Sequence, residues 1–291
     1  MKRVLTPIAR NLFWLVLGDG FVKGAMVLVT VMVARALGAS SVGVFSIAIG
    51  AVLVAIPLFS MGQVEVLIRD TAATPESAEA LVGAAHRLQA RALAFLLPLG
   101  LLIALLLRDQ ELKWTLLAFA LYPVLRMRTV TIAAAFKGLD RMDVEVKARF
   151  FEMGLILVLV GIVAAAHGPV WTTGIAFCIG AAVSLGWIAT RRHQLPRGDA
   201  TSRSLDLLRA GLPFVGIAVG SQLLFRSDLF LAAAFAIPKD RIGLYGASAT
   251  LIWGVLALPQ LTALALYPTF SRLSAARRPS SISALAAAAL G

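Results

Sequence analysis

Runs of about 20 apolar residues recur along the whole chain, and no other feature constrains the fold as strongly. A helix of that length crosses the ~30 Å hydrocarbon core of a bilayer. Only 14% of the residues are charged, whereas a soluble domain carries about a quarter. The pattern therefore predicts an all-α fold, that of a polytopic helical membrane protein.

Eight full transmembrane helices are expected, followed by a stub. The stub, SISALAAAALG, has about half the length that a span requires. The first apolar run imitates a signal peptide, but it is too long and contains Asp19 and Lys23, so we interpret it as a retained helix. The predicted spans are 12–37, 42–62, 80–107, 114–136, 147–166, 170–190, 207–236 and 242–270.

The basic residues predict the orientation of the chain. If the N-terminus is inside, 18 Lys and Arg residues fall in inner segments and 4 in outer loops. Such a bias places the N-terminus in the cytoplasm and the protein in the cytoplasmic (inner) membrane. It also accounts for the net charge of +12 through contact with anionic membrane lipid, without any nucleic acid as a partner.

An offset of 200 residues aligns the chain with itself. The segment from Leu12 falls on the segment from Leu212 without a gap, and Gly20 meets Gly220. Chance similarity between two hairpins is the alternative. Because six helices separate the copies, the match predicts a parallel repeat with a path between two lobes.

The repeat predicts a six-helix N-terminal lobe at 1–195, a cytoplasmic linker at 196–206 and an incomplete C-terminal lobe at 207–291. With the second lobe incomplete, we expect the 291 residues not to transport on their own. They would be part of a longer reading frame, or half of a split or dimeric assembly.

The segment ARALGASSVGVFSIAIGAVLVAIPLFSMGQVEVLIRD (Ala34–Asp70) resembles the opening of the oligosaccharide flippases. These are the O-antigen and polysaccharide exporters of the multidrug/oligosaccharidyl-lipid/polysaccharide superfamily. The likeness is carried by Ala-Arg-x-Leu-Gly at the end of the first span, Gly-x-Phe in the second, and the stretch from Gly62 to Arg69. The resemblance implies two six-helix lobes and transport of a lipid-linked sugar.

Charged residues inside the spans are the candidate site residues, because each costs about 2.5–3.5 kcal/mol at mid-helix unless it faces protein or water. Asp19 and Lys23 are four residues apart and can pair, either as a structural pair or as one wall of a cavity. The repeat puts Arg226 on the equivalent face of the equivalent helix. Two such cations on opposite walls suit a pyrophosphate.

Four other charged positions complete the set. Arg126 and Arg128 are about 200° apart on a straight helix, so we expect one in the cavity and the other paired, with a bend at Pro123. Asp228 is either a structural partner or an ion-coupling site. Glu65 and Arg69, at the inner end of the second span, are interpreted as an interfacial snorkelling pair.

These residues favour a flippase for polyprenyl-pyrophosphate-linked oligosaccharide in polysaccharide biosynthesis. A MATE-like multidrug antiporter is the main alternative, and a non-transporting scaffold for envelope synthesis is a third. No nucleotide-binding motif or metal-ligand cluster is found in the sequence. We therefore expect no enzyme activity, no cofactor and no metal. The expected protein partners are an envelope polysaccharide polymerase or a glycosyltransferase.

Overall fold

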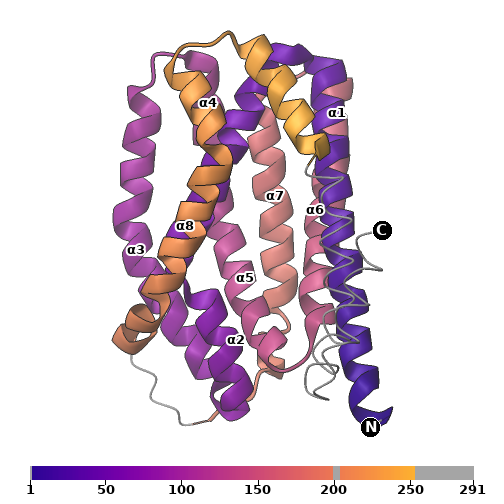
Figure 1. The fold of residues 1–291 in the computed structure, drawn as a ribbon, viewed down its shortest axis with the longest axis vertical. Helices are drawn as coiled ribbons and strands as arrows, with labels where there is room; N and C mark the ends of the chain where they lie inside the picture. The colour runs from indigo at the N-terminus through magenta and orange to yellow at the C-terminus, as the bar shows by residue number, and fades with distance from the viewer. Residues whose placement is uncertain (1, 199–203, 253–291) are drawn as a thin grey trace, which may run out of the picture.

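A computed structural model describes residues 2–198 and 204–252, and every regular element in these two ranges is a helix. The long helices run up and down along one common direction (Figure 1). In chain order the elements are α1 Lys2–Ser60, α2 Gln63–Ala73, η1 Pro75–Ser77, α3 Ala78–Leu106, α4 Gln110–Phe119, α5 Tyr122–Gly138, α6 Met142–Ala165, α7 Trp171–Ala189, η2 Arg192–Gln194 and α8 Ser204–Ala234. A last described helical segment covers 239–252.

Six stretches of these helices are long and apolar enough to cross a membrane. The first, Phe13–Ser60, has 48 residues, about twice the length of one span, and it contains the first two predicted spans. The predicted spans from 80–107 to 207–236 fall on the other five stretches. The eighth predicted span begins within 239–252, and its remainder lies outside the described residues, as does the predicted stub.

A glycine reverses the chain inside α1. Gly38 has φ 84° and ψ 171°, a backbone conformation that is essentially restricted to glycine. A Cβ atom placed there would have no neighbour within 4 Å, so backbone geometry alone requires the glycine. Figure 1 shows α1 rising from the N-terminus to the top of the bundle and then descending. The two arms of α1 form the first predicted hairpin.

The predicted span 114–136 is instead divided into α4 and α5. Pro123 has no N–H to donate to the carbonyl of Phe119, so the helix breaks before it. The thiol of Cys178 on α7 donates to the carbonyl oxygen of Ala118 at 3.3 Å, which satisfies one acceptor beside the break. The bend predicted from Pro123 is therefore present, as an interruption of the helix.

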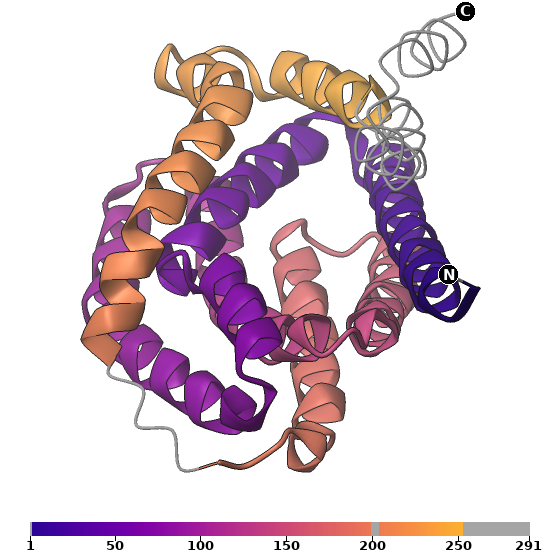
Figure 2. The same cartoon turned by 60° about the horizontal axis from the view of Figure 1, so that its bottom comes forward.

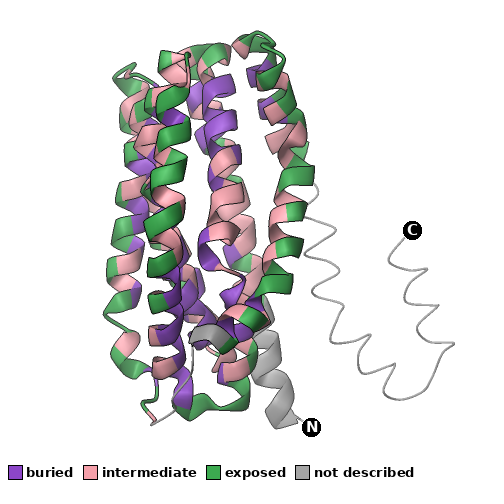
Figure 3. Cartoon of the chain, turned by 90° about the vertical axis from the view of Figure 1, so that its left-hand side faces the viewer, coloured by how far each residue is buried: buried purple, intermediate pink, exposed green. Residues whose placement is uncertain are grey.

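The exterior of the bundle is apolar. Phe95, Leu106 and Leu224 are each more than 70% exposed, and Figure 3 shows exposed residues along the outer helices and buried ones toward the middle. Exposed apolar side chains over whole helices are costly in water but favourable in lipid. The structure is thus that of a multi-pass membrane protein.

The connections sort onto the two ends of the bundle. The hairpin at Gly38, the link from α3 to α4 and the link after α8 lie at the top of Figure 1, whereas the N-terminus and α2 lie at the bottom. Lys239 joins two of the top connections, with Nζ 2.7 Å from Asp109 and 3.0 Å from Glu111. The pKa of Asp109 lies below its usual value, because hydrogen bonds from Lys239 and two amides outweigh the upward effect of burial. This sorting agrees with the predicted alternation of loops, while the side that faces the cytoplasm stays a prediction.

Helix α8 packs against α1, α2 and α3, and Figure 2 shows it beside the second arm of α1, where Phe230 approaches Gly50. At the top, a Cβ on Gly43 would overlap the carbonyl oxygen of Lys239, and a Cβ on Gly243 would overlap that of Ala39. At the bottom, Gly62 and Gly211 approach each other in the same way. Backbones therefore touch at both ends, as small residues permit between membrane helices.

Substitution at Gly38 tests the hairpin. Gly38→Ala should lower the free energy of unfolding by about 1–3 kcal/mol, because alanine disfavours this backbone conformation. Gly24→Ala is the matched control, since Gly24 lies in the same helix with equal space around it. It should be neutral or stabilising by up to about 1 kcal/mol. Denaturant unfolding in detergent micelles measures both, and equal effects would contradict the assignment of the reversal to Gly38.

Candidate functional site: a cationic cavity

A cavity of about 490 Å³ lies within the bundle, enclosed by α1, α5, α6, α7, α8 and 239–252. Both charged side chains and aromatic rings line it. Five charged residues line it: Asp19, Lys23, Arg126, Arg149 and Arg226. Four of these are cations, so among the described lining residues the cavity is strongly basic.

The first arm of α1 contributes one charged face. Asp19, Lys23, Met26 and Thr30 follow helical spacing and all line the cavity. The carboxylate of Asp19 lies 2.8 Å from Nζ of Lys23. The predicted pair thus forms, and it does so on the cavity wall.

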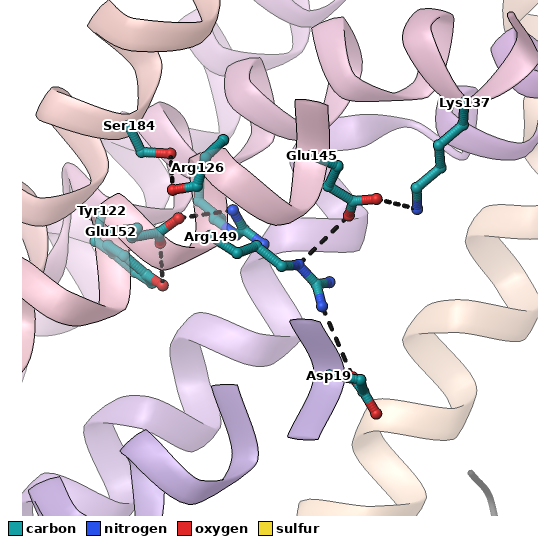
Figure 4. Close-up of polar contacts among 9 residues, drawn as sticks. Asp19, Tyr122, Arg126, Lys137, Glu145, Arg149, Glu152 and Ser184 are labelled. Atoms are coloured by element: carbon teal, nitrogen blue, oxygen red, sulfur yellow. Dashed lines mark hydrogen bonds and ion pairs between the residues drawn. The ribbon is translucent and has the colours of Figure 1, made fainter. Parts of the chain in front are cut away.

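Helix α6 presents a row of charges toward α1 and α5 (Figure 4). Arg149 lies 3.7 Å from Asp19 and 3.4 Å from Glu145, and Glu145 is held by Lys137 at 2.6 Å. Glu145 is only 4% exposed, so its charge depends on these partners. The row links α1, α5 and α6 through alternating charges.

A second group lies deeper, where α5 meets α6. Glu152 is 1% exposed and accepts hydrogen bonds from Arg126 at 2.7 Å and from the Tyr122 hydroxyl at 2.9 Å. Tyr122 and Arg126 are one turn apart on α5, so a single buried carboxylate fixes both side chains. Arg126 therefore lines the cavity with its orientation fixed by Glu152, which does not itself line the cavity.

Aromatic rings complete the wall beside these charges. Phe45, Tyr122 and Phe177 line the cavity, and Phe119 packs between them with ring centroids 5.2–6.4 Å apart. Such tilted and edge-to-face contacts favour one arrangement of the rings. The lining is thus mostly apolar, with a cluster of cations beside the aromatic rings.

Arg226 reaches the cavity from α8, which faces the arms of α1. Among the residues that the structure describes, no carboxylate lies within ion-pair distance of Arg226. Asp228 is near enough to act on it electrostatically without direct contact. Asp228 itself does not line the cavity, and it accepts a hydrogen bond from the Tyr245 hydroxyl. Of the two readings predicted for Asp228, this geometry fits the structural partner.

The structure brings Lys23, Arg126 and Arg226 of the predicted site together, with Asp19, but not the remaining residues. Arg128 does not line the cavity and lies close enough to His86 to act on it electrostatically. One of the two arginines of α5 therefore faces the cavity, as predicted, but that one, Arg126, is also the paired one.

Glu65 and Arg69 lie beyond the second predicted span, and the structure gives Arg69 a different ion-pair partner. The second arm of α1 ends at Ser60, and both residues lie on the separate helix α2, after a turn at Gly62 with φ 63°. Arg69 pairs with its neighbour Asp70 at 2.8 Å, a contact that raises the pKa of Arg69. Both side chains are exposed, and their snorkelling toward an interface stays a prediction.

Arg149, Glu152 and Tyr122 were not identified from the sequence as site residues. Glu145, Arg149 and Glu152 are spaced by four and three residues, so they share one face of a helix. A charged stripe along an apolar helix marks a face turned away from lipid. The spacing of these residues could therefore have identified them, but Arg149 was used only to predict which side of the membrane the N-terminus faces.

The arrangement can hold an anion without any metal or cofactor. Guanidinium and ammonium groups from α1, α5, α6 and α8 converge on one space and donate charge-assisted hydrogen bonds. Within the residues that the structure describes, no group of three His, Cys, Asp or Glu side chains is placed to bind a metal ion. The chemistry of the cavity is therefore that of anion recognition.

Comparison with known protein families gives a match over most of the chain. The family model described as "Polysaccharide biosynthesis protein" matches residues 8–274. No significant match was found among curated proteins or among solved structures.

The buried pair of Arg126 and Glu152 gives a stability prediction. Glu152→Gln leaves the charge of Arg126 without its counter-charge, so the free energy of unfolding should fall by about 3 kcal/mol or more. The double variant Arg126→Gln/Glu152→Gln should recover much of that loss. Asp143→Asn, which breaks the exposed pair with Lys147, is the control and should cost less than about 1 kcal/mol.

Denaturant titration in detergent micelles measures these differences. A double variant as unstable as Glu152→Gln alone would show that the loss does not come from the unpaired arginine.

Proposed function

Because the chain belongs to the polysaccharide biosynthesis protein family, we propose that it is a flippase for polyprenyl-pyrophosphate-linked oligosaccharide. It would move this lipid across the cytoplasmic membrane with its N-terminus in the cytoplasm. The observation that carries the proposal is the convergence of Lys23, Arg126, Arg149 and Arg226 on one cavity within membrane-spanning helices. Their donors suit a diphosphate, which accepts several charge-assisted hydrogen bonds at once.

The transport step we propose is alternating access between two lobes. The offset of 200 residues supports such lobes through the contacts at the top of the bundle. Gly43 meets Lys239, and Gly243 meets Ala39, so the two contacts exchange under that offset. Reciprocal contacts of this kind are expected beside a pseudo-two-fold axis, and the cavity lies between the segments that this axis would relate.

No chemical step is part of this function. The cavity residues would bind and release the headgroup. An envelope polysaccharide polymerase or a glycosyltransferase would supply or consume the lipid-linked sugar as a partner. Anionic lipid would meet the basic residues at the inner end.

A multidrug antiporter is the alternative from the same superfamily. Its substrates are often cationic. Four basic side chains and only one carboxylate are among the described residues that line the cavity, so a cation in the cavity would be repelled. A non-transporting scaffold would have no need for buried charges, which are costly within a membrane. The charge of the cavity therefore favours the flippase over both.

Substitution of Arg226 tests the cavity as the headgroup site. Arg226→Ala should weaken binding of a polyprenyl-pyrophosphate-linked oligosaccharide about tenfold or more, since a charge-assisted hydrogen bond contributes about 1.5–3 kcal/mol. Arg226→Glu should be worse because repulsion adds to the lost attraction. Lys23→Ala should also weaken binding. Equilibrium binding of the radiolabelled lipid to detergent-solubilised protein measures each change.

Arg241→Ala is the matched control, because Arg241 is exposed and does not line the cavity. The same variants are then compared in a flipping assay on the full-length gene product in liposomes. Normal flipping by Lys23→Ala/Arg226→Glu would contradict the cavity assignment. Transport of a fluorescent cationic drug, with no flipping of lipid, would favour the antiporter.

A further inference from the structure

A second, smaller cavity adjoins the first and shares an ion pair with it. This vestibule has a volume of about 230 Å³ and is lined by Leu15, Gly18, Asp19, Lys137, Glu145, Val146 and Arg149. Asp19 and Arg149 line both cavities, and their side chains meet between them (Figure 4). The pair therefore stands where the two spaces join, on the side of α1 and α6.

The contacts of Arg149 are longer than those of its neighbours. Its nitrogens lie 3.7 Å from Asp19 and 3.4 Å from Glu145, whereas Lys137 and Arg126 hold their carboxylates at 2.6 and 2.7 Å. Glu145 is thus mainly engaged by Lys137, and Asp19 by Lys23 at 2.8 Å. Among these cations, Arg149 should be the easiest for another anion to bind, because breaking its long contacts with Asp19 and Glu145 costs little energy.

We propose that Asp19 is an internal competitor for the anionic headgroup and that a phosphate displaces it from Arg149. This inference rests on the proposed function, since it requires an anionic substrate in the cavity. In the structure the carboxylate of Asp19 bridges Lys23 and Arg149. A diphosphate carries more charge than one carboxylate and can address both cations, so it replaces Asp19 on Arg149.

The exchange has a mechanical result, because the bridge joins α1 to α6. At this level the helices are tightly apposed: a Cβ on Gly18 would lie 2.9 Å from the side chain of Val146. Close to it, the ammonium group of Lys147 lies over the ring of Trp14 at 5.6 Å. Once the headgroup holds Arg149, Asp19 no longer ties α1 to α6, and the vestibule widens between them.

Binding of a pyrophosphate probe tests the competition. Farnesyl pyrophosphate has the charged group and a short prenyl chain but no sugar. Asp19→Asn should bind it about three- to tenfold more tightly than the wild type, because the competing charge is removed while the shape is kept. Arg149→Gln should bind it more weakly, and Arg149→Lys should retain most of the affinity. Asp240→Asn, an exposed acid that does not line the cavity, is the control and should match the wild type.

The distance between α1 and α6 tests the mechanical part. Spin labels at Leu17→Cys and Phe151→Cys, in a Cys178→Ala background, sit on exposed positions of α1 and α6. Double electron–electron resonance should show a longer distance after farnesyl pyrophosphate is added. Asp19→Asn should show the longer distance without the probe. A distance that neither the probe nor Asp19→Asn changes would overturn the release of α1 from α6.

The outcomes separate this inference from the proposed function. If the wild type binds no farnesyl pyrophosphate, the anion site itself fails, and the competition fails with it. If the wild type binds and Arg226→Ala does not, but Asp19→Asn binds no more tightly, the site stands and the competition is wrong. Gel filtration and thermal unfolding of each variant identify any loss of folding, and Arg149→Lys keeps the test informative should Arg149→Gln not fold.

Discussion

Charges placed inside a membrane must meet counter-charges or water, and the interior of this bundle is organised around that requirement. Five cations (Lys23, Arg126, Lys137, Arg149 and Arg226) are gathered on the inner faces of α1, α5, α6 and α8. Three carboxylates (Asp19, Glu145 and Glu152) form ion pairs with cations of this group. The cations therefore outnumber these carboxylates, and the excess positive charge lies at the cavity, where a substrate anion would neutralise it.

Helix α6 carries most of this organisation. Its charged stripe pairs toward α1 through Arg149 and toward α5 through Glu145 and Glu152, while its opposite side exposes Phe151, Val158 and Ile162. Because a buried carboxylate costs several kcal/mol unless it is paired, each of these contacts fixes the rotation of α6. The wall of the cavity is thereby held rigid. The side chain of Arg126 is oriented by Glu152, which does not line the cavity.

The periodicity of the sequence predicted the helices well, because a span needs only length and apolar composition. The pairing of Asp19 with Lys23 was equally accessible, since both lie on one helix and spacing decides whether they meet. Arg226 could be placed across one cavity from Lys23 because the repeat relates their helices. Each of these predictions depends on local spacing or on an internal comparison.

Contacts between different helices were less predictable. The partner of Arg126 is Glu152, 26 residues away, and no local rule relates the rotation of α5 to that of α6. Glu65 and Arg69 lie one turn apart on α2, but Arg69 forms its ion pair with the adjacent Asp70. The break before Pro123 followed from proline chemistry, but the thiol of Cys178 that satisfies it comes from α7.

The glycine contacts made by the segment 239–252 at the top and by α8 at the bottom have a further consequence for how the bundle can move. At each end backbone meets backbone, with Gly43 and Gly243 at the top and Gly62 and Gly211 at the bottom. Apolar side chains beside these glycines are buried as well, with Ile242 packed against Ile47 and Leu229 at the top and Leu207 in the core at the bottom. Each end is therefore closed by backbone apposition and by buried side chains together, so any movement of this part of the chain has to separate both.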